Sequence, residues 1–243
     1  MRRLLPSTAL ACLAIAAPAA AQGTATATPN AAGKGALINM EFDASQPPVS
    51  GRIPKDTVLS IQKGYGFQPK AVAKRCNQQQ ADAGKCPSKS IIGMGALQAD
   101  AFGSTFTVPL SFYLAKPQVK GDLAGFVSVA ELNGRKMAAF GRVVTATSEP
   151  YGISVILPTA GADMAASLGA TFKSFSATIG NSRVVKKYRK VKGKRKLVSK
   201  KRFDLIKNPA VCDPAVGTWA ANAVFTFSDD STAEVASPIS CTP

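Results

Sequence analysis

The chain has 243 residues, with 30 lysines and arginines, 14 aspartates and glutamates and no histidine, so its formal net charge is +16. The absence of histidine removes the commonest general acid–base residue and the commonest metal ligand, which excludes histidine-based catalytic and metal sites. The length fits one large domain or two small ones.

The first 21 residues have the organisation of a secretory signal peptide. Its parts are the basic Arg2 and Arg3, the apolar stretch 4–17 and the small residues 19–21, after which cleavage is expected. The apolar stretch is short and contains a proline, so no transmembrane segment is predicted. We therefore expect a secreted, extracellular protein, with association with the cell wall as an open alternative.

Four cysteines follow this segment, and their even number in an exported chain predicts two disulfides. They are Cys76, Cys86, Cys212 and Cys241. Four cysteines allow three pairings, and near-neighbour pairing is favoured because each bond would then close one local loop. A zinc site is not expected, since this part of the chain has neither a Cys-x-x-Cys motif nor a histidine. No metal and no cofactor are predicted.

Residues 22–35 are small, polar and aperiodic, which predicts a flexible leader ahead of a single folded domain over 36–243. Within that domain, short β-like runs alternate with turn signals. The predicted strands are 36–42, 57–62, 90–99, 106–115, 125–132, 136–146, 152–158, 172–180, 222–228 and 231–237. Only 69–84 and 161–170 favour short helices. This pattern predicts an all-β fold, an antiparallel β-sandwich.

Two local signals predict hairpins within this series of strands. Asn133-Gly134 lies between two apolar runs, and both residue types tolerate the positive φ of a tight turn. Asp229-Asp230 lies between the last two predicted strands and is typical of a turn.

The most unusual segment is 183–202, which contains twelve lysines or arginines and no acid. Once Arg2 and Arg3 are set aside, the remaining 28 bases exceed the 14 acids by 14. The segment 183–202 supplies 12 of these positive charges, so the rest of the chain has a net charge of only +2. Gly193 lies midway between two runs that mix apolar residues with bases. We therefore predict a long protruding basic hairpin with its turn at Gly193.

Concentrated positive charge attracts polyanions, so the hairpin is the candidate anion-binding site. The residues assigned to it are Lys186, Lys187, Arg189, Lys190, Lys192, Lys194, Arg195, Lys196, Lys200, Lys201 and Arg202. Outside a cell the expected partners are an anionic cell-wall polymer or an acidic polysaccharide. Two aromatic residues are too few for a nucleic-acid stacking track, so no specific nucleic acid is expected. A solvated hairpin whose lysines prevent edge pairing is the open alternative.

Candidates for catalysis are few. Glu41 and Asp43 share one face of a predicted strand, and Asp229-Asp230 form a second acidic pair. Paired carboxylates can cleave glycosidic bonds, which leaves a carbohydrate-active enzyme as an alternative. Trp219 could stack on a sugar, although a lone tryptophan in a β-sandwich is usually part of the core. No catalytic residue is assigned, and the sequence favours a protein that is not an enzyme.

Three short motifs are similar to those of a group of secreted β-rich proteins from high-GC Gram-positive bacteria. The first is Cys76 followed by Cys86-Pro87-x-x-Ser90-x-Ile92-Gly93, and the second is Asn208-Pro209-x-x-Cys212. The third is the closing series of Trp219, Phe225-x-Phe227, the acidic turn and Cys241. The resemblance implies the fold and the location, and it transfers no catalytic residue. Members of the group often have a modest glycine-centred turn where this chain has its basic hairpin.

The sequence thus predicts a non-enzymatic envelope or extracellular module that contacts an anionic polymer. A structural module that binds another protein remains a further alternative. The oligomeric state is left open.

Overall fold

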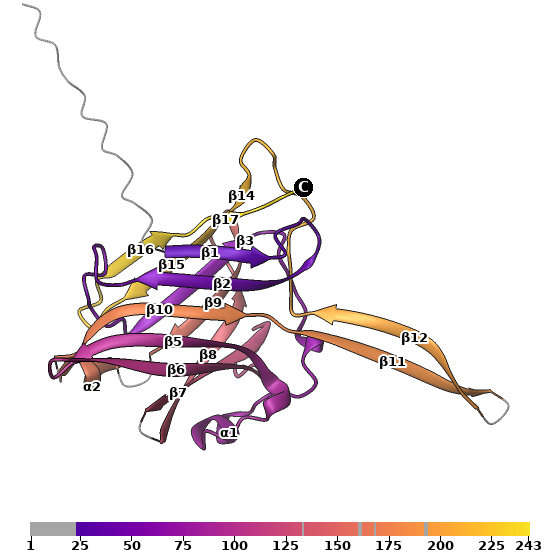
Figure 1. Cartoon of the computed structure of the whole chain (residues 1–243), viewed down its shortest axis with the longest axis horizontal. Coiled ribbons are helices and arrows are strands. Elements are labelled where there is room, and N and C mark those ends of the chain that lie inside the picture. The colour runs from indigo at the N-terminus through magenta and orange to yellow at the C-terminus, as the bar shows by residue number, and fades with distance from the viewer. Residues whose placement is uncertain (1–22, 133, 160–161, 168, 192–193) are drawn as a thin grey trace, which may run out of the picture.

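A computed structural model describes residues 23–132, 134–159, 162–167, 169–191 and 194–243 (Figure 1). The predicted signal peptide over 1–21 lies outside the described residues. Across the described part the chain is nearly all β, as its alternating apolar pattern predicts.

In chain order the strands are β1 (Gly23–Thr28), β2 (Gly35–Asp43), β3 (Asp56–Gln62), β4 (Gly66–Phe67), β5 (Ile91–Ala101), β6 (Ser104–Ala115), β7 (Ala124–Leu132), β8 (Arg135–Thr145), β9 (Tyr151–Pro158), β10 (Thr171–Ile179), β11 (Ser182–Val191), β12 (Lys194–Asp204), β13 (Ile206–Lys207), β14 (Thr218–Trp219), β15 (Ala221–Thr226), β16 (Thr232–Ala236) and β17 (Ile239–Ser240). All ten predicted runs and the two strands of the basic hairpin are present, whereas β1, β4, β13, β14 and β17 were not predicted.

The helices are short. All except the single turn at Ser88–Ser90 lie within the two stretches that were predicted to favour helices. They are η1 (Pro69–Ala71), α1 (Gln78–Asp82), η2 (Ser88–Ser90) and α2 (Ala162–Ser167). Asn77 caps α1, because its side chain accepts a hydrogen bond from the Gln80 backbone N–H while the Gln80 side chain accepts one from Asn77 N–H.

Both predicted β-hairpins are present. β7 and β8 pair in antiparallel register up to Leu132 and Arg135, with Gly134 at φ +74°; Asn133 lies outside the described residues. β15 and β16 pair around the acidic turn, where Asp230 has a φ of +59°. In each case a residue type that tolerates positive φ occupies the turn.

The strands do not divide into the two separate sheets that a sandwich prediction implies. Fifteen of them form one hydrogen-bonded sheet, whose main path is β14-β17-β1-β2-β10-β5-β6-β7-β8-β9-β3-β15-β16. This sheet curls, so that β3, β8 and β9 cross behind β2, β10 and β5 in Figure 1. Phe42 on β2 stacks on Phe225 of β15, with ring centroids 4.7 Å apart, because the two limbs of the sheet face each other.

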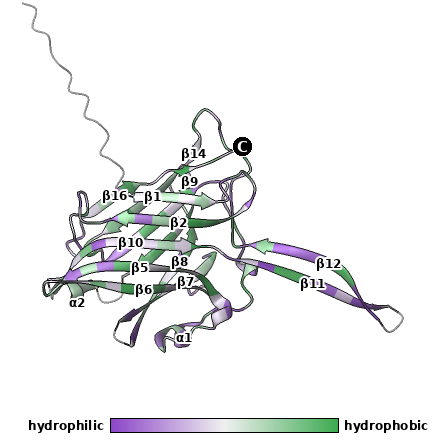
Figure 2. Cartoon of the chain, viewed as in Figure 1, coloured by the Kyte–Doolittle hydropathy of each residue, from purple (hydrophilic) through white to green (hydrophobic). Residues whose placement is uncertain are grey.

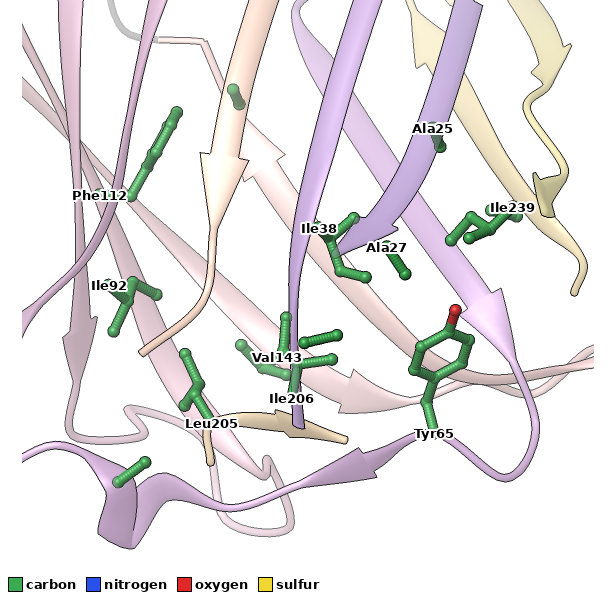
Figure 3. Close-up of a cluster of buried hydrophobic side chains, with 14 of the residues drawn as sticks. Ala25, Ala27, Ile38, Tyr65, Ile92, Phe112, Val143, Leu205, Ile206 and Ile239 are labelled. Atoms are coloured by element: carbon green, nitrogen blue, oxygen red, sulfur yellow. The ribbon is translucent and has the colours of Figure 1, made fainter. Parts of the chain in front are cut away.

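The core fills the space inside the curl. Figure 3 shows side chains from β1, β2, β5, β6, β8 and β13 pointing into it, with Ile38, Phe112 and Leu205 among the labelled residues. Trp219 is also buried there, donates its indole N–H to the Val211 carbonyl over 3.0 Å and meets Tyr65 edge to face. Trp219 is therefore a core residue, and it offers no surface on which a sugar could stack.

The two disulfides follow the favoured near-neighbour pairing, Cys76–Cys86 and Cys212–Cys241, with Cα atoms 5.1 and 5.8 Å apart. The first closes the loop that carries α1, and the second joins the loop after β13 to the end of β17. Each bond removes conformational freedom from a loop in the unfolded chain.

The prediction of a flexible leader over 22–35 is wrong for most of that segment. Gly23–Thr28 form β1, which pairs antiparallel with β2 along its whole length and parallel with β17 at Ala25 and Ile239. Ala25 and Ala27 are buried in the core, whereas the threonines that alternate with them, Thr24, Thr26 and Thr28, are exposed. The alternating threonines and alanines are thus a half-buried strand whose buried side chains are unusually small.

Because β1 is part of the core, a charge on its buried face should unfold the protein far more readily than the same charge on its exposed face. We expect Ala25→Lys to lower the free energy of unfolding by more than about 3 kcal/mol, since it buries an unpaired cation. Thr24→Lys is the matched control, because Thr24 is exposed and lies opposite Glu41. Thermal unfolding of both variants checks this, and equal melting temperatures would show that β1 is not part of the cooperative fold.

Candidate anion-binding site

The basic segment forms the long hairpin that the sequence predicts. β11 and β12 pair antiparallel from Ser182 and Asp204 at the root to Val191 and Lys194 near the turn. The two strands form a sheet of their own, and Figure 1 shows them extending away from the curled sheet. Gly193, the predicted turn residue, lies outside the described residues.

The described bases of the hairpin are all exposed. This holds for Arg183 and for ten of the eleven residues assigned to the candidate site, which are Lys186, Lys187, Arg189, Lys190, Lys194, Arg195, Lys196, Lys200, Lys201 and Arg202. Lys192 lies outside the described residues. Among these described bases only Arg202 has a carboxylate partner, Asp204, at 2.8 Å.

The register places bases directly opposite one another across the two strands. Lys186 faces Lys200, and Lys190 faces Arg195. Like charges in directly opposed positions destabilise a β-ladder, because their repulsion is not offset by an acid. The arrangement therefore concentrates positive potential on a thin ribbon that has solvent around it.

The apolar side chains of the hairpin are also partly exposed. Val184, Tyr188 and Leu197 lie on one face of the ribbon, with about half of each surface in contact with solvent. Figure 2 shows hydrophobic and hydrophilic segments alternating along both strands. The Arg195 guanidinium lies 4.9 Å from the centroid of the Tyr188 ring, which is a cation–π distance.

A groove at the root of the hairpin adds residues that sequence reasoning did not assign. It has a volume of about 390 Å³ and lies between the segment 69–75 and the start of the hairpin. Its lining residues are Pro69, Lys70, Val72, Ala73, Lys74, Arg75, Arg183, Val185 and Phe203. More than 100 residues separate its two walls in sequence, so no local sequence motif predicts the groove.

The acidic pair Asp229-Asp230 stabilises a turn through ion pairs. Asp229 pairs with Arg52 at 2.8 Å and Asp230 with Lys55 at 3.3 Å, so both acids brace the β15–β16 turn against the segment before β3. Among the residues that the structure describes, no three side chains of Cys, Asp or Glu gather as a metal site would require.

Glu41 and Asp43 do lie together, in a shallow hollow of about 350 Å³ that is also lined by β10. The Ser45 hydroxyl and backbone N–H donate to Asp43 at 2.6 and 2.9 Å, which lowers the pKa of that carboxyl below its ordinary value. A glycosidase needs one carboxyl with a raised pKa as its proton donor. Asp43 has the opposite shift, so it is unsuited to that role.

No protein-family model matches the chain, and no curated protein or solved structure shows significant similarity to it. The helices in the described part of the chain are all too short to span a membrane. The candidate site must therefore be interpreted from its own geometry.

Because bases lie opposite one another in the hairpin, we predict that the pairing of β11 with β12 is less stable at low ionic strength. Raising salt from 10 to 500 mM should slow amide hydrogen exchange in β11 and β12 several-fold, because screening weakens the repulsion between the strands. Amides of β6 and β7 are the internal control and should be little affected. Equal salt responses in both regions would contradict the assignment of cross-strand repulsion to the hairpin.

Proposed function

We propose that the chain is an exported, non-enzymatic module of the cell envelope or extracellular space that contacts an anionic polymer through the hairpin 183–202. The observation that carries this proposal is the set of exposed hairpin bases of which, among those described, only one has an acidic partner. Elsewhere in the fold, bases such as Arg52 and Arg142 are neutralised by acids at 2.8 and 2.7 Å.

An extended polymer suits the shape of the hairpin. A ribbon of paired strands presents cations along both faces, and a flexible polyanion can follow them without fitting a deep pocket. Such binding gains free energy from counterion release and therefore weakens steeply as salt rises. The two disulfides are consistent with an oxidising compartment, where cell-wall polymers and acidic polysaccharides are the available polyanions.

Co-sedimentation with purified cell wall tests this proposal. We expect the protein to sediment with the wall at about 20 mM salt and to be released at about 500 mM, since the contact is electrostatic. In the hairpin variant, seven bases are changed to serine: Lys186, Lys187, Arg189, Lys190, Lys194, Arg195 and Lys196. This variant should lose most of its binding at low salt.

A body variant provides the matched control, because it loses the same seven charges from exposed positions outside the hairpin. Its serine substitutions replace Lys34, Lys85, Lys89, Lys116, Lys120, Arg135 and Lys207. Wall binding close to that of the unsubstituted protein is expected. If the two variants lose binding equally, net charge and not the hairpin is responsible, and the proposal fails.

A further inference from the structure

We propose that the groove at the root of the hairpin is a separate binding site for a phosphate monoester whose organic part is an apolar ring or chain. The choice of ligand rests on the proposed function, because a phosphorylated unit is one of the groups that an anionic polymer can present. The site itself is defined by residues outside the assigned set, namely Lys70, Lys74, Arg75 and Arg183.

Four basic residues line this groove, and no acid is among its lining residues. Within the described part of the chain none of the four has an ion-pair partner, although seven other bases do. Bases that line one groove without a counter-charge raise its positive potential, and a bound dianion would be attracted to it. Two of the four lining bases are arginines, which suit phosphate because a guanidinium group can donate two parallel hydrogen bonds to it.

The rest of the lining is apolar, which a free inorganic anion does not require. Val72 is buried, and Val185 and Phe203 are half-buried at the root of the hairpin. Phe203 also packs against the main core, so its ring is held in place. An apolar group attached to the phosphate would cover this surface and gain free energy from its burial.

Both walls of the groove are fixed to the curled sheet. The segment 69–75 is held at one end by the Gln68 backbone N–H, which donates to the Leu205 carbonyl at 2.9 Å, and at the other by Cys76, which is disulfide-bonded and hydrogen-bonded to Leu114. On the other wall, Leu205 N–H donates to the Asn181 carbonyl at 2.7 Å. Fixed walls lower the entropy cost of binding a small ligand.

The groove differs in kind from the outer hairpin. The outer hairpin is a convex ribbon that can contact any polyanion, whereas the groove is concave and its volume of about 390 Å³ falls within the range of small-molecule sites. The root can therefore select one chemical unit, while the outer bases supply attraction without selection.

Calorimetric titration of the purified protein with phenyl phosphate, inorganic phosphate and benzoate tests the proposal. Phenyl phosphate should bind at least about tenfold more tightly than inorganic phosphate, because only the former covers the apolar lining. It should also bind at least about tenfold more tightly than benzoate, which carries one negative charge instead of two. Equal affinities for phenyl phosphate and either of the other probes would overturn the assignment.

Two variants locate the binding. The double variant Lys74→Ser, Arg183→Ser should weaken phenyl phosphate binding at least about tenfold, and both residues are exposed, so the fold should be retained. The control variant Lys190→Ser, Arg195→Ser removes two charges from the outer hairpin and should leave phenyl phosphate binding within about twofold. Equal losses in the two variants would overturn the proposal.

The outcome is separable from that of the proposed function. Loss of phenyl phosphate binding in the groove variant, with wall binding unchanged by the hairpin variant, would support the groove and reject the polymer contact. Wall binding that depends on the hairpin, with no binding of phenyl phosphate, would support the polymer contact and reject the groove as a binding site.

Discussion

The backbone hydrogen bond from Leu205 to Asn181, 2.7 Å long, joins the two chain segments where β11 and β12 leave the curled sheet. The Asn181 side chain in turn donates to the Ile91 carbonyl at the start of β5, and Leu205 is buried in the core. These contacts fix the root of the hairpin, whereas in the described part of the ribbon β11 and β12 form a sheet only with each other. A charged hairpin can therefore extend into solvent without destabilising the body.

Charge segregation follows from this arrangement. Six acids in the described part of the body pair with bases of the body, and one of them is Asp122. The Arg142 guanidinium donates two hydrogen bonds to Asp122 and lowers the pKa of that carboxyl. The outer part of the hairpin lies beyond the reach of these acids. Its bases consequently remain available to a partner, and their mutual repulsion favours a bound polyanion.

Much of the fold could be predicted from sequence because its signals are local. Alternating apolar residues identified ten strands, and Asn-Gly and Asp-Asp located two hairpin turns. The even number of cysteines and their spacing favoured the observed disulfides. The motif residues Ser90 and Asn208 prove to be buried structural groups: the Ser90 hydroxyl donates to the Pro87 carbonyl, and Asn208 donates to the carbonyls of Pro29 and Ala31.

What could not be predicted depends on contacts between distant segments or on unusually small side chains. β1 was missed because its buried residues are alanines, which gave the segment the composition of a leader. The single curled sheet was missed because strand order depends on pairings such as β3 with β9 and β15, which alternation alone does not specify. The groove was missed for the same reason, since Lys74 and Arg183 come together only in the folded chain.

The salt dependence of binding to a defined polyanion, long-chain inorganic polyphosphate, tests the central claim most directly. If the hairpin bases form the contact, the logarithm of the affinity should fall linearly with the logarithm of the salt concentration, with a slope of about −4 or steeper. Changing the seven hairpin bases to serine should at least halve that slope, whereas the body variant should keep it. An unchanged slope in the hairpin variant would show that polyanions bind elsewhere, and the account would be wrong.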